Sequence, residues 1–282
     1  MGENVRKAGE AGRAEHIFAL AAYGESPYLE LQIQALRAQT VPSEILLCSA
    51  TENPQLHTLA ARYGLPLLLR QGEPNLRDDW NFAYEEGRKR ARLVTIAHQD
   101  DFYYSNYTAE LLRAYREFPD MSVFCCRYDT IDGAGRRIPG KAEWVKRLLR
   151  FRLRNRSRAD QTAVKRSALL FGNGIGCPTC TYNSVLCGAP LFRNDYRFII
   201  DWDTLLRLSA LPGRFICVEK PLMAYRVHAG AETMQQMKSH NREREEEEEF
   251  RKLHGPLLAK LLLRLYRSSY STYRRKGGIG EG

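Results

Sequence analysis

The chain has 282 residues, 44% of them hydrophobic and 27% charged, which is ordinary for a folded globular protein and excludes a disordered chain. No apolar run approaches the ~20 residues that cross a bilayer. The charged segment from Met1 to Glu15 lacks the apolar core of a secretory signal, so we expect a cytoplasmic protein. The net charge of +10 predicts a polyanionic neighbour, and nucleic acid, anionic lipid and nucleotide phosphates all fit this charge.

Short apolar runs and helical patterns alternate through the first third of the chain. After an arm over residues 1–14, which we expect to be mobile, strands and helices follow one another strictly. This alternation is typical of a mostly parallel sheet with helical crossovers, and so of the α/β class. The expected strands cover 16–22, 44–48, 66–69 and 93–97, and the expected helices cover 29–37, 54–63 and 78–90.

The rest of the chain continues with mixed elements and then changes composition. From Met234 the composition changes: an acidic run from Glu243 to Glu249 gives way to leucines flanked by Lys and Arg, which predicts a helical tail. We therefore expect an arm over 1–14, one domain over 15–232 and a helical extension over 233–282. Inside the domain we expect helices over 108–118, 162–170 and 204–211, strands over 122–128, 215–218 and 221–227, and a turn over 129–135.

Residues 146–158 form a basic stretch in which arginines alternate with apolar residues. One interpretation is a solvated amphipathic helix. The other is contact with phosphate or with an anionic membrane, and the basic second part of the tail fits this interpretation too.

The seven cysteines are an odd number and lie mostly in apolar runs, which indicates reduced core thiols. Cys177 and Cys180 have the spacing of a zinc half-site or a redox pair. No second such pair lies at a useful distance, which favours a structural role for both thiols.

Two adjacent carboxylates, Asp100 and Asp101, follow the fourth expected strand directly. Ligands of open α/β folds bind at the carboxyl edge of the sheet, where these acids would lie. Paired carboxylates there suit a hard divalent cation, and such a cation suits a diphosphate. The alternative is a solvated loop with an Asp that caps the next helix.

Two later segments supply further polar groups. Asp201-Trp-Asp203 begins an expected helix, and Tyr225-Arg-Val-His228 ends the last expected strand. A separate carboxylate, one that does not bind the cation, could remove a proton from an acceptor hydroxyl. An Arg and a His could meet phosphate oxygens or complete the ligands of the cation.

In their order these motifs resemble the family-2 glycosyltransferases with the GT-A fold, and the resemblance covers about residues 16 to 230. The sequence Ala-His-Gln-Asp-Asp at 97–101 is similar to a bacterial subgroup that acts in the cytoplasm. Further matches are Ala22 to Glu30 with Leu36 to Thr40, Asp79-Trp-Asn81, Asn173 through Thr179, and Tyr225 to His228.

The resemblance implies an inverting transfer from a nucleotide-diphospho-sugar to a glycan or lipid-linked hydroxyl, with Mg²⁺ or Mn²⁺ as cofactor. It implies Asp201 as the catalytic base, and no nucleic acid partner is expected. Peripheral contact with an anionic membrane is inferred from the basic residues of 146–158 and of the tail, not from the family motifs. The implied metal ligands are Asp100, Asp101 and His228. The implied nucleotide-sugar residues are Ala22, Tyr23, Glu25, Ser49, Asp79, Asn81, Gln99 and Arg226, and the implied acceptor-side residues are Asn173, Pro178, Thr179, Trp202 and Asp203.

Three positions depart from the family pattern. Cys48-Ser-Ala50 stands where the second strand usually ends in Asp residues that read the base and ribose. His98 replaces the first acid of the metal motif, which leaves Asp100 as the main expected ligand and Asp101 as its support. Ile200 replaces the Glu that usually precedes the base. A degenerate, weakly active or altered-donor enzyme is an alternative that these changes leave open.

Two other functions stay open from the residues alone. A sugar nucleotidyltransferase of similar fold would carry a Gly-rich loop with Lys or Arg after the first strand, and the segment from Ala22 to Ser26 has neither feature. A non-catalytic basic module that binds anionic membrane or nucleic acid would show steep salt dependence and would tolerate the loss of one acid.

Overall fold

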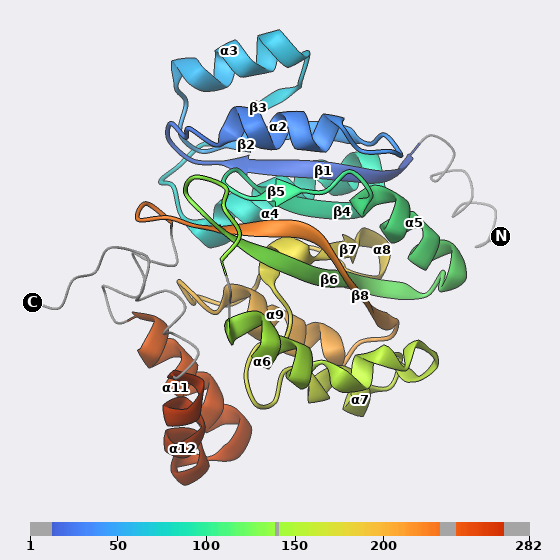
Figure 1. Cartoon of the computed structure of the whole chain (residues 1–282), viewed down its shortest axis with the longest axis vertical. Coiled ribbons are helices and arrows are strands. Elements are labelled where there is room, and N and C mark those ends of the chain that lie inside the picture. Colours follow the sequence, from blue (N-terminus) through green and yellow to red (C-terminus); the bar gives the residue numbers. More distant parts are fainter. Residues whose placement is uncertain (1–12, 139–140, 232–240, 268–282) are drawn as a thin grey trace, which may run out of the picture.

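The computed structural model describes residues 13–138, 141–231 and 241–267. Its centre is an eight-stranded mixed sheet in the order β3-β2-β1-β4-β7-β6-β8-β5 (Figure 1). The strands are β1 (Ala14–Ala22), β2 (Glu44–Ser49), β3 (Leu67–Leu69), β4 (Ala91–His98), β5 (Phe102–Tyr103), β6 (Met121–Asp132), β7 (Thr181–Asn183) and β8 (Arg214–Val227). The helices are α2 (Leu29–Arg37), α3 (Pro54–Tyr63), α4 (Leu76–Arg90), α5 (Tyr107–Glu117), α6 (Lys141–Leu149), α7 (Thr162–Ser167), α8 (Ser184–Cys187), α9 (Ile200–Ser209), α11 (Asn241–His254) and α12 (Pro256–Arg267), with the 3-10 turns η1 (Phe151–Arg154), η2 (Arg156–Arg158) and η3 (Cys177–Thr179).

The strand and helix alternation predicted for the first third of the chain is confirmed. β1 pairs in parallel with both β2 and β4, and β2 pairs in parallel with β3. The Asn53 side chain caps α3 by accepting the Leu56 N–H, and Gly64 ends that helix with φ of 63°, a conformation that favours glycine. The carboxyl ends of these parallel strands therefore meet at one edge of the sheet.

The second half departs from expectation in three places. Residues 129–132, expected in a turn, continue β6. The two strands expected over 215–218 and 221–227 are one strand, β8, whose pairing with β6 contains register shifts. The basic stretch 146–158 is not one helix, because α6 ends at Leu149 and the short turns η1 and η2 follow. β7 runs antiparallel to β4 and β6, so the sheet is mixed.

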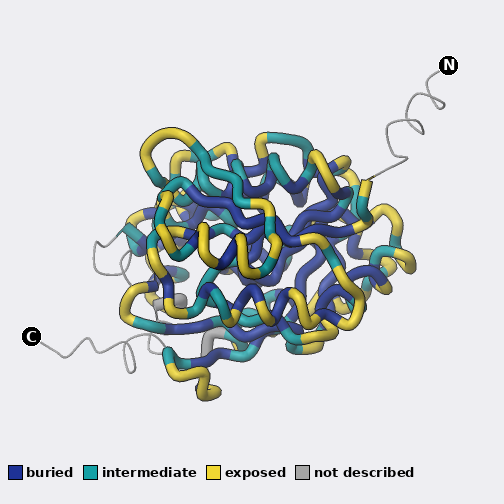
Figure 2. The backbone as a smooth tube through the Cα atoms, turned by 90° about the horizontal axis from the view of Figure 1, so that it is seen from above, coloured by how far each residue is buried: buried dark blue, intermediate teal, exposed yellow. Residues whose placement is uncertain are grey.

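Helices surround the sheet. α4 packs on β1, β2 and β4, and α7 packs on α9. In Figure 1, α2 and α3 lie beside β1 to β3, and α6, α7 and α9 lie at the opposite end, beyond β6 and β8. Figure 2 shows the buried chain in the middle of the molecule, with exposed loops around it.

The first C-terminal helix, α11, packs on the domain, and the second, α12, packs on α11. Phe250 of α11 is fully buried, and its ring meets the Trp202 ring of α9 edge-on at 5.1 Å. The expected extension over 233–282 is thus helical over 241–267, and its other residues lie outside the described residues. The expected arm over 1–14 also lies outside them up to residue 12, while Ala14 already belongs to β1. Within the described part of the chain, every helix is too short or too polar to cross a bilayer.

Candidate active site

The loops that follow β1 and β4 are joined at the carboxyl edge of the sheet. The Gln99 side chain exchanges two hydrogen bonds with the backbone of Tyr23: the Tyr23 N–H donates to Gln99 Oε1, and Gln99 Nε2 donates to the Tyr23 carbonyl, each at 3.0 Å. The Tyr23 ring is exposed. The metal motif expected after β4 therefore lies beside the turn after β1.

Asp100 pairs with His228 across the sheet edge. His228 Nε2 lies 2.9 Å from Asp100 Oδ2, and both side chains are partly exposed, at 20% and 24%. Residues 128 positions apart in the chain meet here because β8 ends beside the loop after β4. The Tyr28 ring, just before α2, lies 4.9 Å from the His228 ring.

The two neighbouring acids have opposite electrostatic character. Burial favours a raised pKa at Asp100, but the hydrogen bond from His228 and the imidazoles of His98 and His228 outweigh it, so the pKa of Asp100 is lowered. Burial and the charge of Asp100 raise the pKa of Asp101 well above its usual value. Asp101 is 1% exposed and accepts the Arg226 N–H at 3.1 Å. Asp100 is the ionised acid, and Asp101 is the buried one.

The Arg226 side chain bonds to two backbone carbonyls at this edge of the sheet. Its side chain is buried, Nε donates to the Asp100 carbonyl at 2.8 Å, and Nη1 donates to the Asp132 carbonyl at 3.2 Å. The guanidinium also lies over the Tyr28 ring, 4.4 Å from its centroid. Arg226 thus joins β8, the turn after β6 and the loop of Asp100.

His98 faces the protein interior. Its ring stacks on Trp80 of α4 with centroids 5.0 Å apart, and its carbonyl accepts a hydrogen bond from Gln32. Burial lowers its pKa, which favours the neutral imidazole. Its Nδ1 lies 3.8 Å from Asp101 Oδ2. The residue that departs from the acidic motif is therefore packed rather than presented at the surface.

Asp201 lies in the first turn of α9 and is held from two sides. Asn173 Nδ2 donates to Asp201 Oδ2 at 2.8 Å. Burial raises the pKa of Asp201, while the nearby Lys146 ammonium opposes that rise. Lys146 itself donates to the carbonyls of Asn173 at 2.9 Å and Ile175 at 3.1 Å. Lys146 was expected only as part of the basic stretch, and only the fold brings it to Asp201.

A carboxylate from the C-terminal helices anchors the start of α9. Glu245 of α11 is 4% exposed and accepts three backbone N–H groups, those of Arg197 at 2.9 Å, Phe198 at 2.8 Å and Ile199 at 3.2 Å. These residues directly precede the helix that carries Asp201. Sequence reasoning missed Glu245, because an acidic run on a helix predicts only a solvated face.

Acids from both parts of the site influence the Cys177 thiol. Burial raises the pKa of Cys177 well above its usual value, and the charges of Asp201 and Asp101 add to that rise. The electrostatic influence of both acids therefore reaches this one thiol. All seven cysteines are free, and within the described residues Cys177 and Cys180 belong to no metal cluster.

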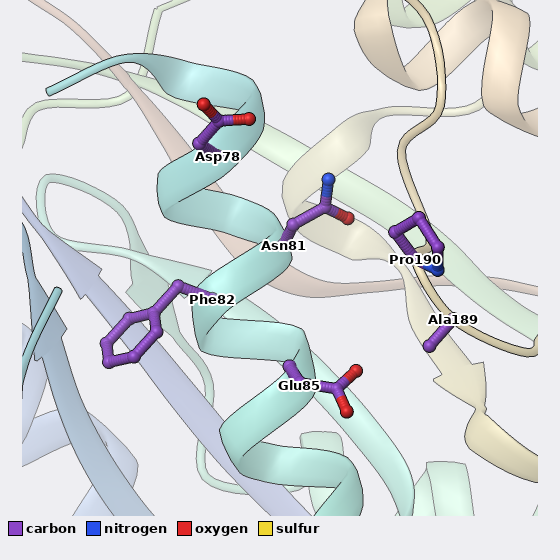
Figure 3. A pocket seen from close by; sticks show the side chains of 6 residues that line it. All are labelled: Asp78, Asn81, Phe82, Glu85, Ala189 and Pro190. Carbon is purple, nitrogen blue, oxygen red and sulfur yellow. The ribbon is translucent and has the colours of Figure 1, made fainter. Parts of the chain in front are cut away.

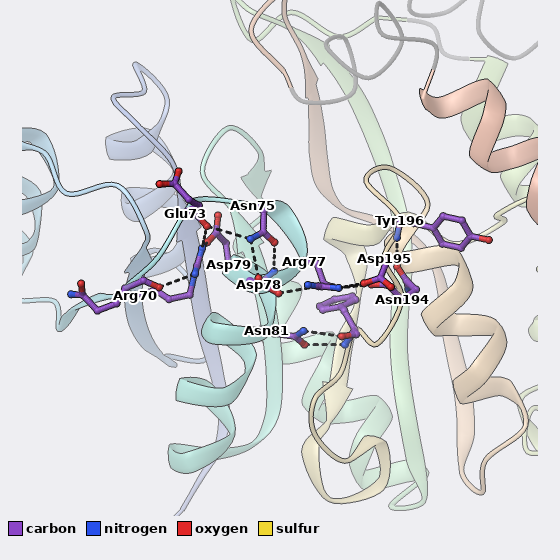
Figure 4. A network of polar contacts seen from close by, with 12 residues as sticks. Arg70, Glu73, Asn75, Arg77, Asp78, Asp79, Asn81, Asn194, Asp195 and Tyr196 are labelled. Carbon is purple, nitrogen blue, oxygen red and sulfur yellow. Dashed lines mark hydrogen bonds and ion pairs between the residues drawn. The ribbon is translucent and has the colours of Figure 1, made fainter.

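The remaining expected donor residues have mixed positions. Ala22 is buried at the end of β1, and Glu25 is exposed. Ser49 is buried and bonds within its own loop to Thr51. Asp79 accepts two hydrogen bonds from Arg70, and the Asn81 amide is engaged with the Phe192 backbone at 2.8 and 2.9 Å (Figure 4).

Most of the expected acceptor-side residues turn inward. Thr179 is fully buried and donates to the Gly176 carbonyl, while the Pro178 carbonyl accepts the Tyr103 hydroxyl. Trp202 is 1% exposed and donates to the Leu169 carbonyl at 2.9 Å. Asp203 accepts a hydrogen bond from Asn194. Of this group, the Asn173 side chain and the Trp202 backbone N–H bond to Asp201, and the others shape the loop and helix around it.

A shallow hollow of about 480 Å³ opens elsewhere, between α4 and the loop after α8 (Figure 3). It is lined by Asp78, Asn81, Phe82, Glu85, Ala189 and Pro190. Because neither Asp100 nor Asp201 lines it, we do not assign the chemistry to this hollow.

The Asp100–His228 pair suits a divalent cation as part of a larger set of ligands. Within residues 13–138, 141–231 and 241–267, no three His, Cys, Asp or Glu side chains gather into a complete protein site. An ionised carboxylate and an imidazole supply one oxygen and one nitrogen ligand. The remaining positions fit phosphate oxygens and water, because Mg²⁺ is commonly held by one or two carboxylates together with substrate phosphates.

Comparison with solved structures identifies the fold. TarS 1-349 of S. aureus in complex with UDP-GlcNAc is 14% identical, with a TM-score of 0.61 over 95% of this chain and 76% of that one. Mannosyltransferase PcManGT of Pyrobaculum calidifontis, in complex with GDP-Man and Mn²⁺, is 13% identical, with a TM-score of 0.62 over 95% and 77%. Glucosyl-3-phosphoglycerate synthase of Mycobacterium tuberculosis, with Mn²⁺, UDP and phosphoglyceric acid, is 14% identical, with a TM-score of 0.50 over 84% and 77%. No protein-family model and no curated protein matches the sequence. At these identities the likeness establishes the fold alone: this chain has the GT-A type of mixed α/β fold.

Proposed function

We propose that the protein is a metal-dependent, inverting hexosyltransferase of glycosyltransferase family 2. It would transfer a sugar from a nucleotide-diphospho-sugar to a hydroxyl of a glycan or lipid-linked acceptor. The observation that carries the proposal is the division of the carboxylates between two elements. An ionised Asp100 pairs with His228 at the strand edge, and a separate Asp201 with a raised pKa begins α9.

Asp100 and His228 would hold Mg²⁺ or Mn²⁺ on the donor side. Bound there, the cation supplies charge that neutralises the departing nucleoside diphosphate. Arg226, near the end of β8, would hold the Asp100 loop against the end of β6, since its guanidinium donates to the carbonyls of Asp100 and Asp132. Asp101 as a supporting ligand stays a prediction. Its raised pKa favours a protonated carboxyl, which is a weaker ligand than Asp100.

Asp201 would act as the base. An Oδ atom of Asp201 would accept the proton of the acceptor hydroxyl while the hydroxyl oxygen attacks the anomeric carbon of the donor. The bond from that carbon to the nucleoside diphosphate breaks in the same displacement, which inverts the anomeric centre. A base with a raised pKa is closer to the working pH and so better matched to proton transfer. Asn173 and Lys146 would fix the carboxylate and keep part of it ionised.

The structural neighbours support the donor class. TarS holds UDP-GlcNAc, and PcManGT holds GDP-Man with Mn²⁺. The identity of the nucleotide is left to experiment, because Cys48 to Ala50 differ from the family's strand-end acids and Ser49 is buried. Of the expected donor residues, Tyr23 and Glu25 are exposed, and Asp79, Asn81 and Gln99 are partly exposed.

Turnover of a donor panel tests the proposal. Native protein is incubated with UDP-, GDP- and TDP-sugars with and without Mn²⁺, and free nucleoside diphosphate is measured. We expect release from one donor class that requires the metal and is lost in Asp100→Asn. Asp195→Asn is the control, because its carboxylate is 96% exposed on the surface. Release from no donor, or equal release in Asp100→Asn, contradicts the proposal.

A further inference from the structure

Exposed apolar side chains gather at one end of the molecule. Within the described residues, twelve large apolar side chains are exposed, and eight of them lie in two segments. In Figure 1 these segments are at the lower end, away from α2 and α3. The first contains Trp144, Leu148, Phe151 and Phe171, and the second contains Leu257, Leu258, Leu261 and Leu265.

α12 is held by one face and leaves the other to solvent. Ala259 is fully buried and Leu263 is 6% exposed, so the helix is packed on the protein. Leu257 is 87% exposed and Leu261 54%, and their spacing of four residues places them on one face. A packed helix with leucines on its outer face has the form of an interfacial helix.

In a solvated basic helix the cations face water and the apolar residues are buried, but α6 and η1 show the opposite arrangement. Arg150 is 1% exposed, and Lys146 bonds to the loop that holds Asn173. Trp144 is instead 67% exposed and Leu148 62%, again four residues apart. Several cations of the basic stretch thus point inward or are engaged, and large apolar groups point outward. Tryptophan is the residue that lipid interfaces favour most clearly.

The loop that carries Phe171 contacts the end of α11, next to the start of α12. The His254 ring at the end of α11 stacks on Phe171 at 5.3 Å, and His254 Nε2 donates to the Leu170 carbonyl at 2.7 Å. α12 begins two residues later, at Pro256. The loop after α7 therefore lies against the start of the second segment.

Both segments carry an excess of positive charge. Arg147, Arg150 and Arg154 pair with Glu219, and Arg150 pairs with Glu143 as well, so three cations meet two carboxylates. α12 contains two exposed cations, Lys260 and Arg264, and no acid, and the sequence contains no Asp or Glu from 256 to 280. Among the described residues Lys260 and Arg264 have no carboxylate partner, and an apolar face bordered by an excess of cations is complementary to an anionic bilayer.

We propose that α6 with η1, and α12, form a surface that docks the protein on an anionic lipid bilayer. Leucine and tryptophan enter the headgroup region, and the cations meet lipid phosphates. A second copy of the chain fits less well, because α12 would bring cations against cations without carboxylates to pair them. The proposal does not depend on the transfer reaction, and its test uses neither donor nor acceptor.

Cosedimentation with vesicles of phosphatidylcholine, with or without phosphatidylglycerol, tests the surface. We expect the full chain to bind the anionic vesicles and to be released by salt. Leu257→Asn/Leu261→Asn should lower the partition coefficient at least tenfold. Each of Lys260→Gln and Arg264→Gln should lower it about fivefold. Leu31→Asn is the matched control, since Leu31 is a half-exposed leucine on α2, at the other end of the molecule.

Circular dichroism confirms that each variant is folded, and Trp144→Gln gives a second, independent loss of binding. The proposal is overturned if the full chain stays in the supernatant with anionic vesicles, or if the double leucine variant binds as the Leu31 control does. It is also overturned if sedimentation velocity finds a dimer that the leucine substitutions dissolve, because that result assigns the face to a second copy.

Discussion

Asp100 and Asp101 are adjacent in the sequence, yet the turn after β4 gives their side chains different surroundings. Asp100 meets an imidazole and some solvent, whereas Asp101 is buried under the backbone of β8. The hydrogen bond from His228 lowers the pKa of the first acid against the effect of burial, and burial raises the pKa of the second. One acid can therefore bind a cation while the other supports the fold.

Asp101→Asn should make stability less dependent on pH. An acid whose folded-state pKa is raised costs nothing below its unfolded-state pKa, and it lowers stability as the pH rises toward the folded-state value. The amide lacks this titration but can still accept the Arg226 N–H. We expect the melting temperature of the variant to fall less than that of the native protein between acid and neutral pH.

Asp132→Asn is the control with the opposite sign. Backbone and side-chain hydrogen bonds from Arg136 lower the pKa of Asp132, so its contribution is present above the unfolded-state pKa and lost in acid. If the melting temperature of Asp101→Asn changed with pH just as that of the native protein does, folding would not raise the pKa of Asp101, contrary to what its burial predicts.

Asn173→Ala should move the acid limb of kcat/KM to higher pH. The substitution removes the hydrogen bond that stabilises the Asp201 carboxylate, and so raises the pKa of Asp201 further. Below that pKa the base is protonated, and we expect kcat/KM near neutral pH to fall about tenfold. The pH profile of donor turnover measures this. Asn106→Ala is the control, because Asn106 is exposed and makes no capping bond. An unmoved limb would exclude Asp201 as the titrating base.

At the scale of elements, α11 holds the residues that lead into α9. Glu245 accepts the three N–H groups that precede α9, and the helix N-terminus favours negative charge nearby. The direction of α9, and with it the position of Asp201, is therefore set partly by a helix some forty residues further along the chain.

Glu245→Ala should lower the free energy of unfolding by about 3 kcal/mol, because buried N–H groups lose a charged acceptor. Urea denaturation measures the change. Glu247→Ala on the same helix should cost less than about 1 kcal/mol, since Glu247 pairs with Arg251 at the surface. Equal costs for the two variants would contradict an anchoring role for Glu245.

The length and periodicity of an element decide whether it could be predicted from the sequence. β1, β2 and β4 are apolar runs bounded by caps and turns, so sequence reasoning finds them and the edge where Asp100 lies. β5 and β7 have two and three residues and carry no periodic signal, and they make the sheet mixed. Asp100 and Asp201 could be named from motifs. Lys146 and Glu245 could not, because only long-range packing brings Lys146 near Asp201 and Glu245 to the residues that precede α9.

At the scale of the whole molecule, the C-terminal helices differ in what they contribute. α11 buries Phe250 against Trp202 and anchors the start of α9, so it is part of the folded domain. α12 packs through Ala259 and Leu263 and offers its other face outward. The expected boundary near residue 232 therefore separates stretches that pack together.

Two truncations separate these contributions. A chain ending at Gly255 keeps α11, and we expect it to remain cooperatively folded. A chain ending at Ala231 leaves Trp202 uncovered and three backbone donors without Glu245, and we expect it to lose cooperative thermal unfolding, as calorimetry would register. A sharp transition in the shorter chain would mean that the domain is complete without α11.

The most direct test of the proposed reaction is a comparison of donor binding and turnover in two variants. Calorimetric titration with the donor and Mn²⁺ measures binding, and release of nucleoside diphosphate in the presence of acceptor measures the chemistry. The site geometry predicts that Asp201→Asn keeps the native affinity within about twofold and loses turnover by about a thousandfold or more. It predicts that Asp100→Asn loses the metal-dependent part of the binding itself. Full turnover in Asp201→Asn, or native metal-dependent affinity in Asp100→Asn, would contradict the division of roles between the two carboxylates.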